Sequence, residues 1–151
     1  MRKTKEKKEI KEEKEAKPIA ITVSGKRKTA IAKATIKAGT GIVRVNKKPI
    51  EIFPYFQKLT LLEPIRIAED TLKQKLAFDI NVNVKGGGSE AQVEASRLAI
   101  AKSLVAFTKS QELKSAYLAY DRSLLVADTR RKEMYKPNDS RARASRQKSY
   151  R

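Results

Sequence analysis

The residues in this sequence best suited to chemistry are the cations at its C-terminal end. Positions 141–151 hold five basic residues, no acidic residue and no aliphatic residue larger than alanine. Guanidinium groups match pairs of phosphate oxygens, and small residues between them let an extended backbone approach a polyanion closely. Tyr150 offers a ring that can stack on a base. This composition favours contact with RNA, with a solubilising or import-signal tail as the alternative.

Two further segments bring cations or bare backbone to places where a phosphate can bind. In the Gly25–Thr29 segment, three successive cations are expected on a turn at a strand junction, and a phosphate clamp and an ordinary exposed turn explain them equally well. The Lys85–Ser89 segment is expected to join a strand to a helix N-terminus, whose N–H groups and dipole suit an anion. The P-loop spacing is absent, which argues against nucleotide hydrolysis. Close approach to an RNA backbone is favoured, with a structural glycine turn as the alternative.

The composition excludes most kinds of catalysis. The chain has no cysteine and no histidine, which removes disulfides, zinc fingers, thiol nucleophiles and imidazole acid–base chemistry together. The carboxylates make no acid–base constellation, since Glu69 and Asp70 are simply adjacent and Asp79, Asp121 and Asp128 are isolated. We therefore expect no enzymatic activity, no cofactor and no metal site.

The charge balance points to a polyanionic partner. The 35 basic and 17 acidic residues leave a net charge of +18 on 151 residues, and such an excess repels itself unless an anion is bound. Nucleic acid is the first expectation, and an anionic membrane surface is well behind it. No run of 18 apolar residues is present, and the charged N-terminus lacks the apolar stretch of a secretory signal, so neither a membrane span nor secretion is expected. The length fits one domain with a real core.

Apolar periodicity predicts the elements in the first half of the chain. Alternating residues predict strands at Ile19–Val23, ending at Ser24-Gly25, at Lys28–Ala38 and at Ile42–Val45. Glycines at 39 and 41 mark one turn, and positions 46–49 mark another. Pro64 is expected in the first turn of a helix that carries Ile65, Ala68, Leu72 and Leu76 at helical spacing.

The second half is predicted to contain one strand and two helices. Residues 78–85 alternate cleanly between apolar and polar. Ser89 is a candidate N-cap for a helix running to about Phe107, which is apolar on one side and small on the other and is therefore expected to pack centrally. A short helix is expected at Gln111–Tyr120.

The order of these elements indicates an α+β domain with helices on one face of a sheet. The other face would carry Lys33, Thr35 and Lys37, or Asn81, Asn83 and Lys85. By composition the chain divides into a charged mobile arm at 1–17, a globular RNA-binding domain at 18–121 and a basic tail at 122–151. The end of this tail cannot bury enough surface to offset the entropy of ordering, so it is expected to order only against an anion.

Several motifs resemble the family of the ninth protein of the small ribosomal subunit. The stretch from Gly25 to Ala34 is similar to the family's opening signature, as are the turn at 39–41 with the following residues 42–49, and the block 82–88 with Gln92 and Arg97. The ending Arg-Gln-Lys-Ser-Tyr-Arg resembles the archaeal and eukaryotic branch. The match runs in order from about Ile19 to Arg151 and leaves out the arm. Where many relatives follow the glycine triplet with a Ser-Gly pair, residues 89–91 here read Ser-Glu-Ala.

The resemblance implies a fold that spacing alone does not give. That fold is a two-layer sandwich of a mixed four-stranded sheet with helices on one face and a left-handed crossover, like domain two of ribosomal protein S five, followed by an extended basic C-terminal tail. It also implies a structural constituent of the small ribosomal subunit in the cytoplasm. The implied partners are ribosomal RNA in the subunit head, peptidyl-site tRNA and neighbouring head proteins, with no membrane and no obligate homo-oligomer.

Carried over residue by residue, the resemblance assigns two sets of contacts. The end of the tail would meet tRNA through Lys148, Ser149, Tyr150 and Arg151. Cations and glycines along the rest of the chain would meet ribosomal RNA: Lys26, Arg27, Lys28, Lys47, Lys48, Lys85, Gly86, Gly87, Gly88, Arg97, Arg122, Arg130, Arg131, Lys132, Lys136, Arg141, Arg143 and Arg146.

Two other classes of protein compete with this interpretation. A DNA-architectural protein would coat duplexes with the same cations, although the basic segments here lack the apolar wedge that such proteins often insert between bases. An enzyme acting on RNA would need a convergent acid–base or metal site, and the sequence offers none.

Overall fold

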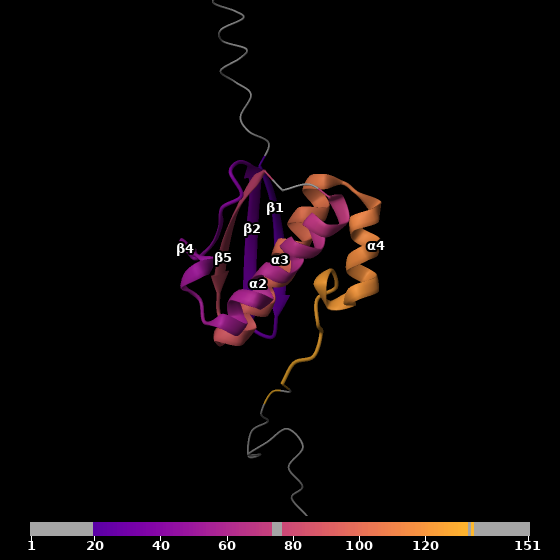
Figure 1. Ribbon diagram of the computed structural model, residues 1–151. Coiled ribbons are helices and arrows are strands. Elements are labelled where there is room, and N and C mark those ends of the chain that lie inside the picture. The colour runs from indigo at the N-terminus through magenta and orange to yellow at the C-terminus, as the bar shows by residue number, and fades with distance from the viewer. Residues whose placement is uncertain (1–19, 74–76, 133, 135–151) are drawn as a thin grey trace, which may run out of the picture.

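A computed structural model of the chain describes residues 20–73, 77–132 and 134. Within these ranges one mixed sheet has the strand order β1-β2-β5-β3-β4, and α-helices cover one of its faces (Figure 1). The strands are β1 Ile21–Arg27, β2 Ala30–Ala38, β3 Val43–Val45, β4 Lys48–Pro49 and β5 Phe78–Lys85. The helices are α2 Tyr55–Leu72, α3 Ser89–Thr108 and α4 Gln111–Tyr120, with the short 3-10 helices η1 Ile50–Ile52 and η2 Arg122–Leu124. No helix of this described part is long and apolar enough to cross a membrane.

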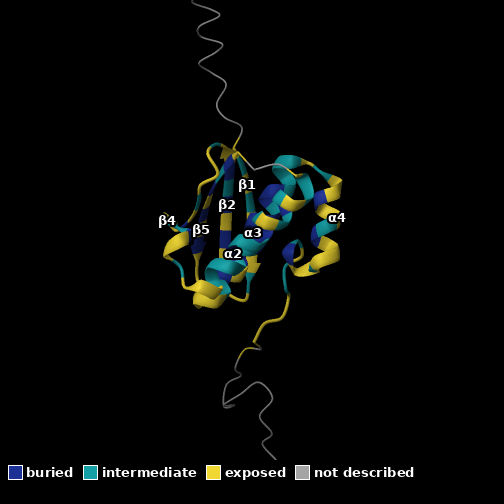
Figure 2. Ribbon diagram, viewed as in Figure 1, coloured by how far each residue is buried: buried dark blue, intermediate teal, exposed yellow. Residues whose placement is uncertain are grey.

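The core lies between the sheet and the helices. In β2 the residues Ala30, Ala32, Ala34 and Ile36 are fully buried, and in β5 the four apolar residues at 78, 80, 82 and 84 are buried as well. The residues between them are mostly exposed, so exposed and buried positions alternate along the strands (Figure 2). Because successive side chains of a strand point to opposite faces, the helices cover only the apolar face. The predicted α+β class with helices on one face is confirmed.

The sheet contains one more strand than the sequence predicted. β1, β2 and β5 are antiparallel neighbours, whereas β3 runs parallel to β5 and reaches it through α2. The fifth strand, β4, pairs with β3 over only two positions, where a turn was expected. Two residues show no alternation, so a strand this short leaves no signal in the sequence. The left hand of the β3–α2–β5 crossover stays a prediction.

The first strand does not end at Gly25, as the sequence suggested, but continues to Arg27. Gly25 is buried in the strand, and a Cβ atom there would lie 2.3 Å from the carbonyl oxygen of Ala95 and 2.8 Å from the backbone nitrogen of Ala99. The absence of a side chain at Gly25 therefore allows α3 to pack closely against β1, and the residue does not form a turn. The chain turns three residues later, at Lys28 and Thr29.

Pro64 lies inside α2 and not in its first turn, so the predicted start of this helix was wrong. The helix begins at Tyr55, directly after Pro54, and the preference of proline for the first turn applies to that earlier proline. Pro64 is buried, and its carbonyl oxygen accepts a hydrogen bond from the Tyr117 hydroxyl at 2.5 Å. Leu76, also assigned to this helix, lies outside the described residues.

α3 is the central helix, as predicted, and it packs on β1, β2, β5 and α2. Its small side is buried too: the hydroxyls of Ser96 and Ser103 donate hydrogen bonds to the carbonyl oxygens of Gln92 and Ile100, at 2.7 and 2.8 Å. The predicted N-cap was wrong by one residue, since Gly88 occupies that position without a side-chain cap. The bounds of α4 agree with the prediction.

The chain stays in contact with the domain after α4. Leu124 in η2 is fully buried and belongs to the core, and Leu125 packs against the core from its edge. The residues closest to the domain in the predicted tail segment are therefore packed on it. The division at 17 and 121 stays a prediction, and the arm 1–17 and residues 135–151 lie outside the described residues.

Candidate nucleic-acid interface

Three turns meet at one end of the sheet. Ala30 pairs with Arg27, and Ile31 pairs with Lys85, so the β1–β2 turn lies beside the end of β5. Because β3 runs parallel to β5, its end at Val45 brings the next turn, Asn46-Lys47, to the same side. This end of the sheet carries five exposed lysines, here called the basic end: Lys26, Lys28, Lys47, Lys48 and Lys85.

The Asn46-Lys47 turn is tied to β5 by the amide of Asn46. Its Oδ1 accepts a hydrogen bond from Val84 N at 2.8 Å, its Nδ2 donates to Val84 O at 3.3 Å, and its backbone N donates to Val82 O at 2.8 Å. Asn46 and Lys47 both have a positive φ, of 49° and 66°. The amide thus continues the sheet where the strand has ended, and it fixes Lys47 and Lys48 next to the end of β5.

The three glycines after β5 do not have the same function. Gly86 and Gly87 have positive φ values of 76° and 70°, and a Cβ atom on either would lie within 3 Å of Thr29 O or the Ala30 side chain. These two glycines let the loop pack against the β1–β2 turn, which is the structural explanation. Gly88 has an extended φ of −93° and open space where a Cβ would be. It alone leaves bare backbone in front of α3.

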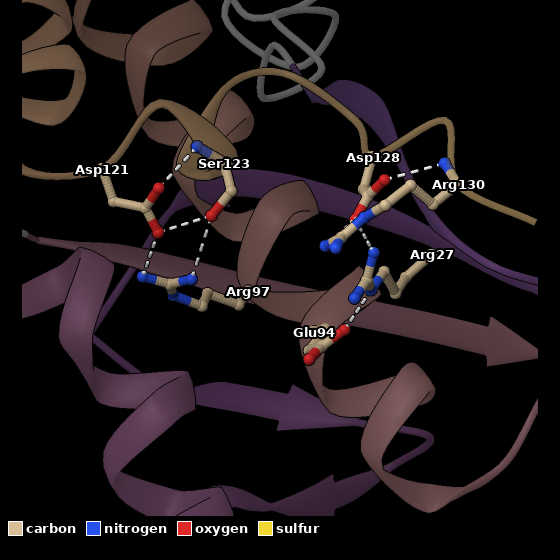
Figure 3. Close-up of polar contacts among 7 residues, drawn as sticks. All are labelled: Arg27, Glu94, Arg97, Asp121, Ser123, Asp128 and Arg130. Carbon is tan, nitrogen blue, oxygen red and sulfur yellow. Dashed lines mark hydrogen bonds and ion pairs between the residues drawn. The ribbon is translucent and has the colours of Figure 1, made fainter.

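Arg27 does not lie with the lysines of the basic end. It continues the series Ile21, Val23 and Gly25 on the helix side of β1, where its guanidinium forms ion pairs with Glu94 of α3 and with Asp128 (Figure 3). Its side chain is only 20% exposed. The pKa of Arg27 is raised, first by the hydrogen bond to Glu94, so the group stays charged.

Asp128 is held by two arginines. Arg130 donates to its carboxylate from Nε and Nη2 at 2.8 and 2.7 Å and from its backbone N at 2.8 Å, and Arg27 adds a further hydrogen bond. These donors hold the pKa of the Asp128 carboxyl far below its usual value, with Arg130 as the main cause. The ion pairs fasten the chain around position 128 to β1 and α3.

A second arginine fastens the chain just after α4. Arg97 of α3 lies 2.5 Å from the carboxylate of Glu63 on α2 through its Nε. Its Nη2 lies 3.1 Å from Asp121 (Figure 3). The pairing with Glu63 is ionic, because the buried Nε has no hydrogen-bond acceptor in line with it. Ser123 donates to Asp121 through its backbone N at 2.8 Å and accepts from Arg97 Nη1 at 3.4 Å. The pKa of Asp121 is lowered, mainly by hydrogen bonds from the Ser123 hydroxyl and backbone N–H and then by Arg97.

The structure thus separates the predicted RNA-binding residues into two groups. Lysines 26, 28, 47, 48 and 85 lie together at the basic end, are exposed, and form no ion pair within the described ranges. Arg27 and Arg97 are occupied by carboxylates inside the domain, so a phosphate would have to displace an existing partner. They anchor the segment that leads to the tail, and Arg27 does so beside the basic end.

The remaining predicted residues lie along the C-terminal segment. Arg122, Arg130 and Arg131 are exposed, and so is Lys132. The other eight lie outside the described residues: Lys136, Arg141, Arg143, Arg146, Lys148, Ser149, Tyr150 and Arg151. In the described ranges no cluster of three or more carboxylates, histidines or cysteines is arranged to hold a metal ion.

The sheet brings together three further cations that were not among the predicted RNA-binding residues. Lys33 and Lys37 on β2 and Arg44 on β3 are exposed on the face that no helix covers, in line with Lys26 and Lys85. The alternation of β2 had already placed its two lysines on the open face. The position of Arg44 could not be found in this way, because it depends on the pairing of β3 with β5.

Comparison with known proteins gives consistent results. A family model described as ribosomal protein S9/S16 matches residues 25–151. The small ribosomal subunit protein uS9 of Methanococcus maripaludis strain C5 is 49% identical over 130 residues, which cover 84% of this chain and 95% of that protein. The protein of the same name from Methanococcus vannielii is 48% identical over the same length and the same shares of both chains.

Proposed function

The chain belongs to the ribosomal protein S9/S16 family, and we propose that it works as a non-catalytic structural constituent of the small ribosomal subunit that binds ribosomal RNA in the subunit head. In this proposal its C-terminal residues Lys148–Arg151 contact peptidyl-site tRNA during translation in the cytoplasm. Neighbouring head proteins are its further partners, and it does not need a second copy of itself.

The observation that carries the RNA-binding proposal is the basic end of the sheet. Five exposed lysines from strand ends and turns lie on one side of the domain, and none of them forms an ion pair within the described ranges. Lysines attract phosphates without reading base edges, so the binding is electrostatic. The position of the protein on the RNA is then set by the RNA backbone and not by the base sequence. Gly88 adds a position without a side chain in front of α3, whose N-terminus has no side-chain cap.

The tRNA contact is supported by the sequence of the tail together with its point of departure. Arg27 and Asp128 hold the chain beside the basic end, so the residues that follow leave the domain next to the lysines proposed to bind ribosomal RNA. Five basic residues among positions 141–151, with no acidic residue, suit a path along phosphates. Lys136 and Arg141, Arg143 and Arg146 would neutralise ribosomal RNA on this path before the last four residues meet tRNA.

Sedimentation tests the ribosomal role. The chain should travel with the small-subunit peak of a cell lysate in stoichiometric amount and be absent from the free pool. Tight association with duplex DNA and no ribosomal RNA would instead identify an architectural DNA-binding protein.

Reconstituted subunits test the tRNA contact separately. Lys148→Gln/Arg151→Gln should weaken tRNA binding in the peptidyl site, because two cations are lost from the contact. If about five phosphates are neutralised by the tail, the tail-dependent part should have a log–log salt slope on the order of −4. The matched control is Lys109→Gln/Lys114→Gln, which removes two exposed cations near α4. Equal tRNA affinity of the two variants would contradict the tRNA contact.

A further inference from the structure

The sheet has a face that no helix covers, and its charge is almost entirely positive. Between Lys26 on β1 and Arg44 on β3 this open face carries the cations Lys26, Lys33, Lys37, Arg44 and Lys85. We infer that the open face is a docking surface for the sugar–phosphate backbone of a double-stranded segment of ribosomal RNA. The inference rests on the proposed ribosomal function and adds a contact area that adjoins the basic end and shares Lys26 and Lys85 with it.

The cations of this face are not neutralised by carboxylates of the described residues. None of the five forms an ion pair in the part of the chain that the structure describes. Such a concentration of one sign is unfavourable without an anion next to it. A sheet face that merely contacts water usually mixes both signs, whereas here the charge is one-sided.

The single carboxylate on this face in the described ranges, that of Asp79, binds the backbone and not a lysine. Oδ1 of Asp79 accepts hydrogen bonds from the backbone N–H groups of Thr40, Gly41 and Ile42 at 2.9, 3.1 and 3.0 Å. Asp79 pairs with Lys37 in the sheet register, yet the two form no ion pair. The carboxylate shapes the loop between β2 and β3 and leaves the lysine available.

The sheet register sets the spacing of the cations. Lys26 and Lys85 flank Ile31, so they lie two strands apart, about 10 Å, and Lys33 and Lys37 lie four residues apart on β2, about 13 Å. Asn81 and Asn83 lie on β5 opposite Thr35 and Lys33, and they offer amide groups that can donate to phosphates and accept from 2′-hydroxyls. This arrangement of charges and amides suits contact with the sugar–phosphate backbone of RNA.

The chemistry of the face selects double-stranded over single-stranded RNA. Sheets that bind single strands stack bases on exposed aromatic side chains. The outward positions of β1, β2 and β5 hold threonine, serine, asparagine, lysine, aspartate and one isoleucine, and no aromatic residue. Double-stranded RNA is recognised instead through phosphates and 2′-hydroxyls, which these residues can contact.

The absence of cysteine from the sequence allows a direct test in the assembled particle. Ser24→Cys places a unique thiol on the open face beside Lys33, and Ser115→Cys places one on the exposed side of α4. With an iron chelate tethered to each thiol, hydroxyl radicals should cleave both strands of a ribosomal RNA helix from position 24. Cleavage from position 115 should be at least several-fold weaker. Protein cleavage without RNA cleavage at position 24 would show that a protein covers the face, and would overturn the inference.

Binding by the isolated full chain tests the same surface without assembly. Lys33→Gln/Lys37→Gln should make the log–log salt slope for an RNA duplex of about 16 base pairs less steep by about 2, since each lysine lost removes about one phosphate contact. The control Lys109→Gln/Lys114→Gln should leave the slope within about half a unit of the parent. Circular dichroism confirms that both variants fold. Equal slopes would refute the docking surface, whereas the ribosomal role fails only if the chain does not sediment with the small subunit.

Discussion

Arg27 on β1 forms an ion pair with Asp128, 101 residues further along the chain. The pair joins the first strand of the domain to the segment that leads to the tail, and Glu94 of α3 holds the other side of the same guanidinium. The sequence around Arg27 suggested that it binds phosphate, but in the structure Arg27 links β1 to α3 and to the segment around Asp128. The contact holds the chain at position 128 against β1 and α3.

Asp128→Asn is predicted to loosen the segment around residue 128 while leaving the domain folded. The amide cannot form ion pairs with Arg27 and Arg130, and it offers a weaker acceptor to the Arg130 N–H. Hydrogen exchange of the backbone amides at 126–130 should become faster, with no change for the amides of β2. Asp70→Asn, which alters an exposed aspartate on α2 that has no ion pair with the described residues, is the control. Unchanged exchange at Arg130 would mean that Asp128 does not fasten the segment.

Asp79 and Asp128 should make stability fall at acid pH. The pKa of each carboxyl is lowered in the folded protein, that of Asp79 first by the backbone N–H of Ile42 and that of Asp128 first by Arg130. Their contribution is therefore complete above the ordinary carboxyl pKa of about 3.9 and is lost as the pH falls through the lower folded value. An NMR titration of the two side-chain carboxyl carbons should give midpoints below about 3.9. A midpoint at or above that value for Asp79 would contradict its hydrogen bonds.

Alanine substitutions should distinguish the three glycines after β5. Gly86→Ala should destabilise the fold by about 1–2 kcal/mol or more, because an alanine there adopts a left-handed φ and its Cβ meets Thr29 O at 2.6 Å. Gly88→Ala should cost less, about 0.5 kcal/mol, since open space surrounds this position and only the preference of the N-cap for glycine over alanine is lost. If Gly88→Ala nevertheless weakens binding to ribosomal RNA, the bare backbone contacts the RNA. A loss of stability equal to that of Gly86→Ala would show that the loop is packed differently.

Tyr117→Phe should cost about 1 kcal/mol in the free energy of unfolding. The Tyr117 hydroxyl is fully buried between α2 and α4 and donates a hydrogen bond to Pro64 O at 2.5 Å, and a net loss of this size is usual for one buried hydrogen bond. Burial also raises the pKa of this tyrosine, so it should not titrate before the protein unfolds in alkali. Tyr55→Phe, at the exposed start of α2, is the control and should be nearly neutral. Denaturant unfolding measures both.

The sequence predicted those elements whose pattern repeats over several residues. The alternation of residues 78–85 gave β5, and α4 was found within its observed bounds, because local periodicity alone determines both. The early end of β1 and the late start of α2 were errors of a different kind. Gly25 usually signals a turn, and Pro64 usually signals the start of a helix. In this fold Gly25 makes room for α3, and the carbonyl oxygen of Pro64 accepts a hydrogen bond from Tyr117 of α4.

The candidate site was predicted in part for the same reason. Lys28, Lys47 and Lys85 lie at or near the ends of strands that the alternation predicted, so their grouping needed only the sheet register. Arg27 could have been assigned to the helix face by extending the alternation of Ile21, Val23 and Gly25 one step further. No pattern links Arg97 to Glu63 and Asp121, which lie on other elements. Ion pairs between distant segments are set by packing and leave no periodic trace.

The row of alanines on β2 has a mechanical consequence. Ala30, Ala32 and Ala34 have no rotatable side-chain bonds, and with Gly25 they let α3 rest almost directly on the sheet backbone. A layer of methyl groups has no rotamers to change, so β1 and β2 are held rigidly against α3. Lysines on the opposite face of these strands would therefore keep their separations when forces act on them during protein synthesis.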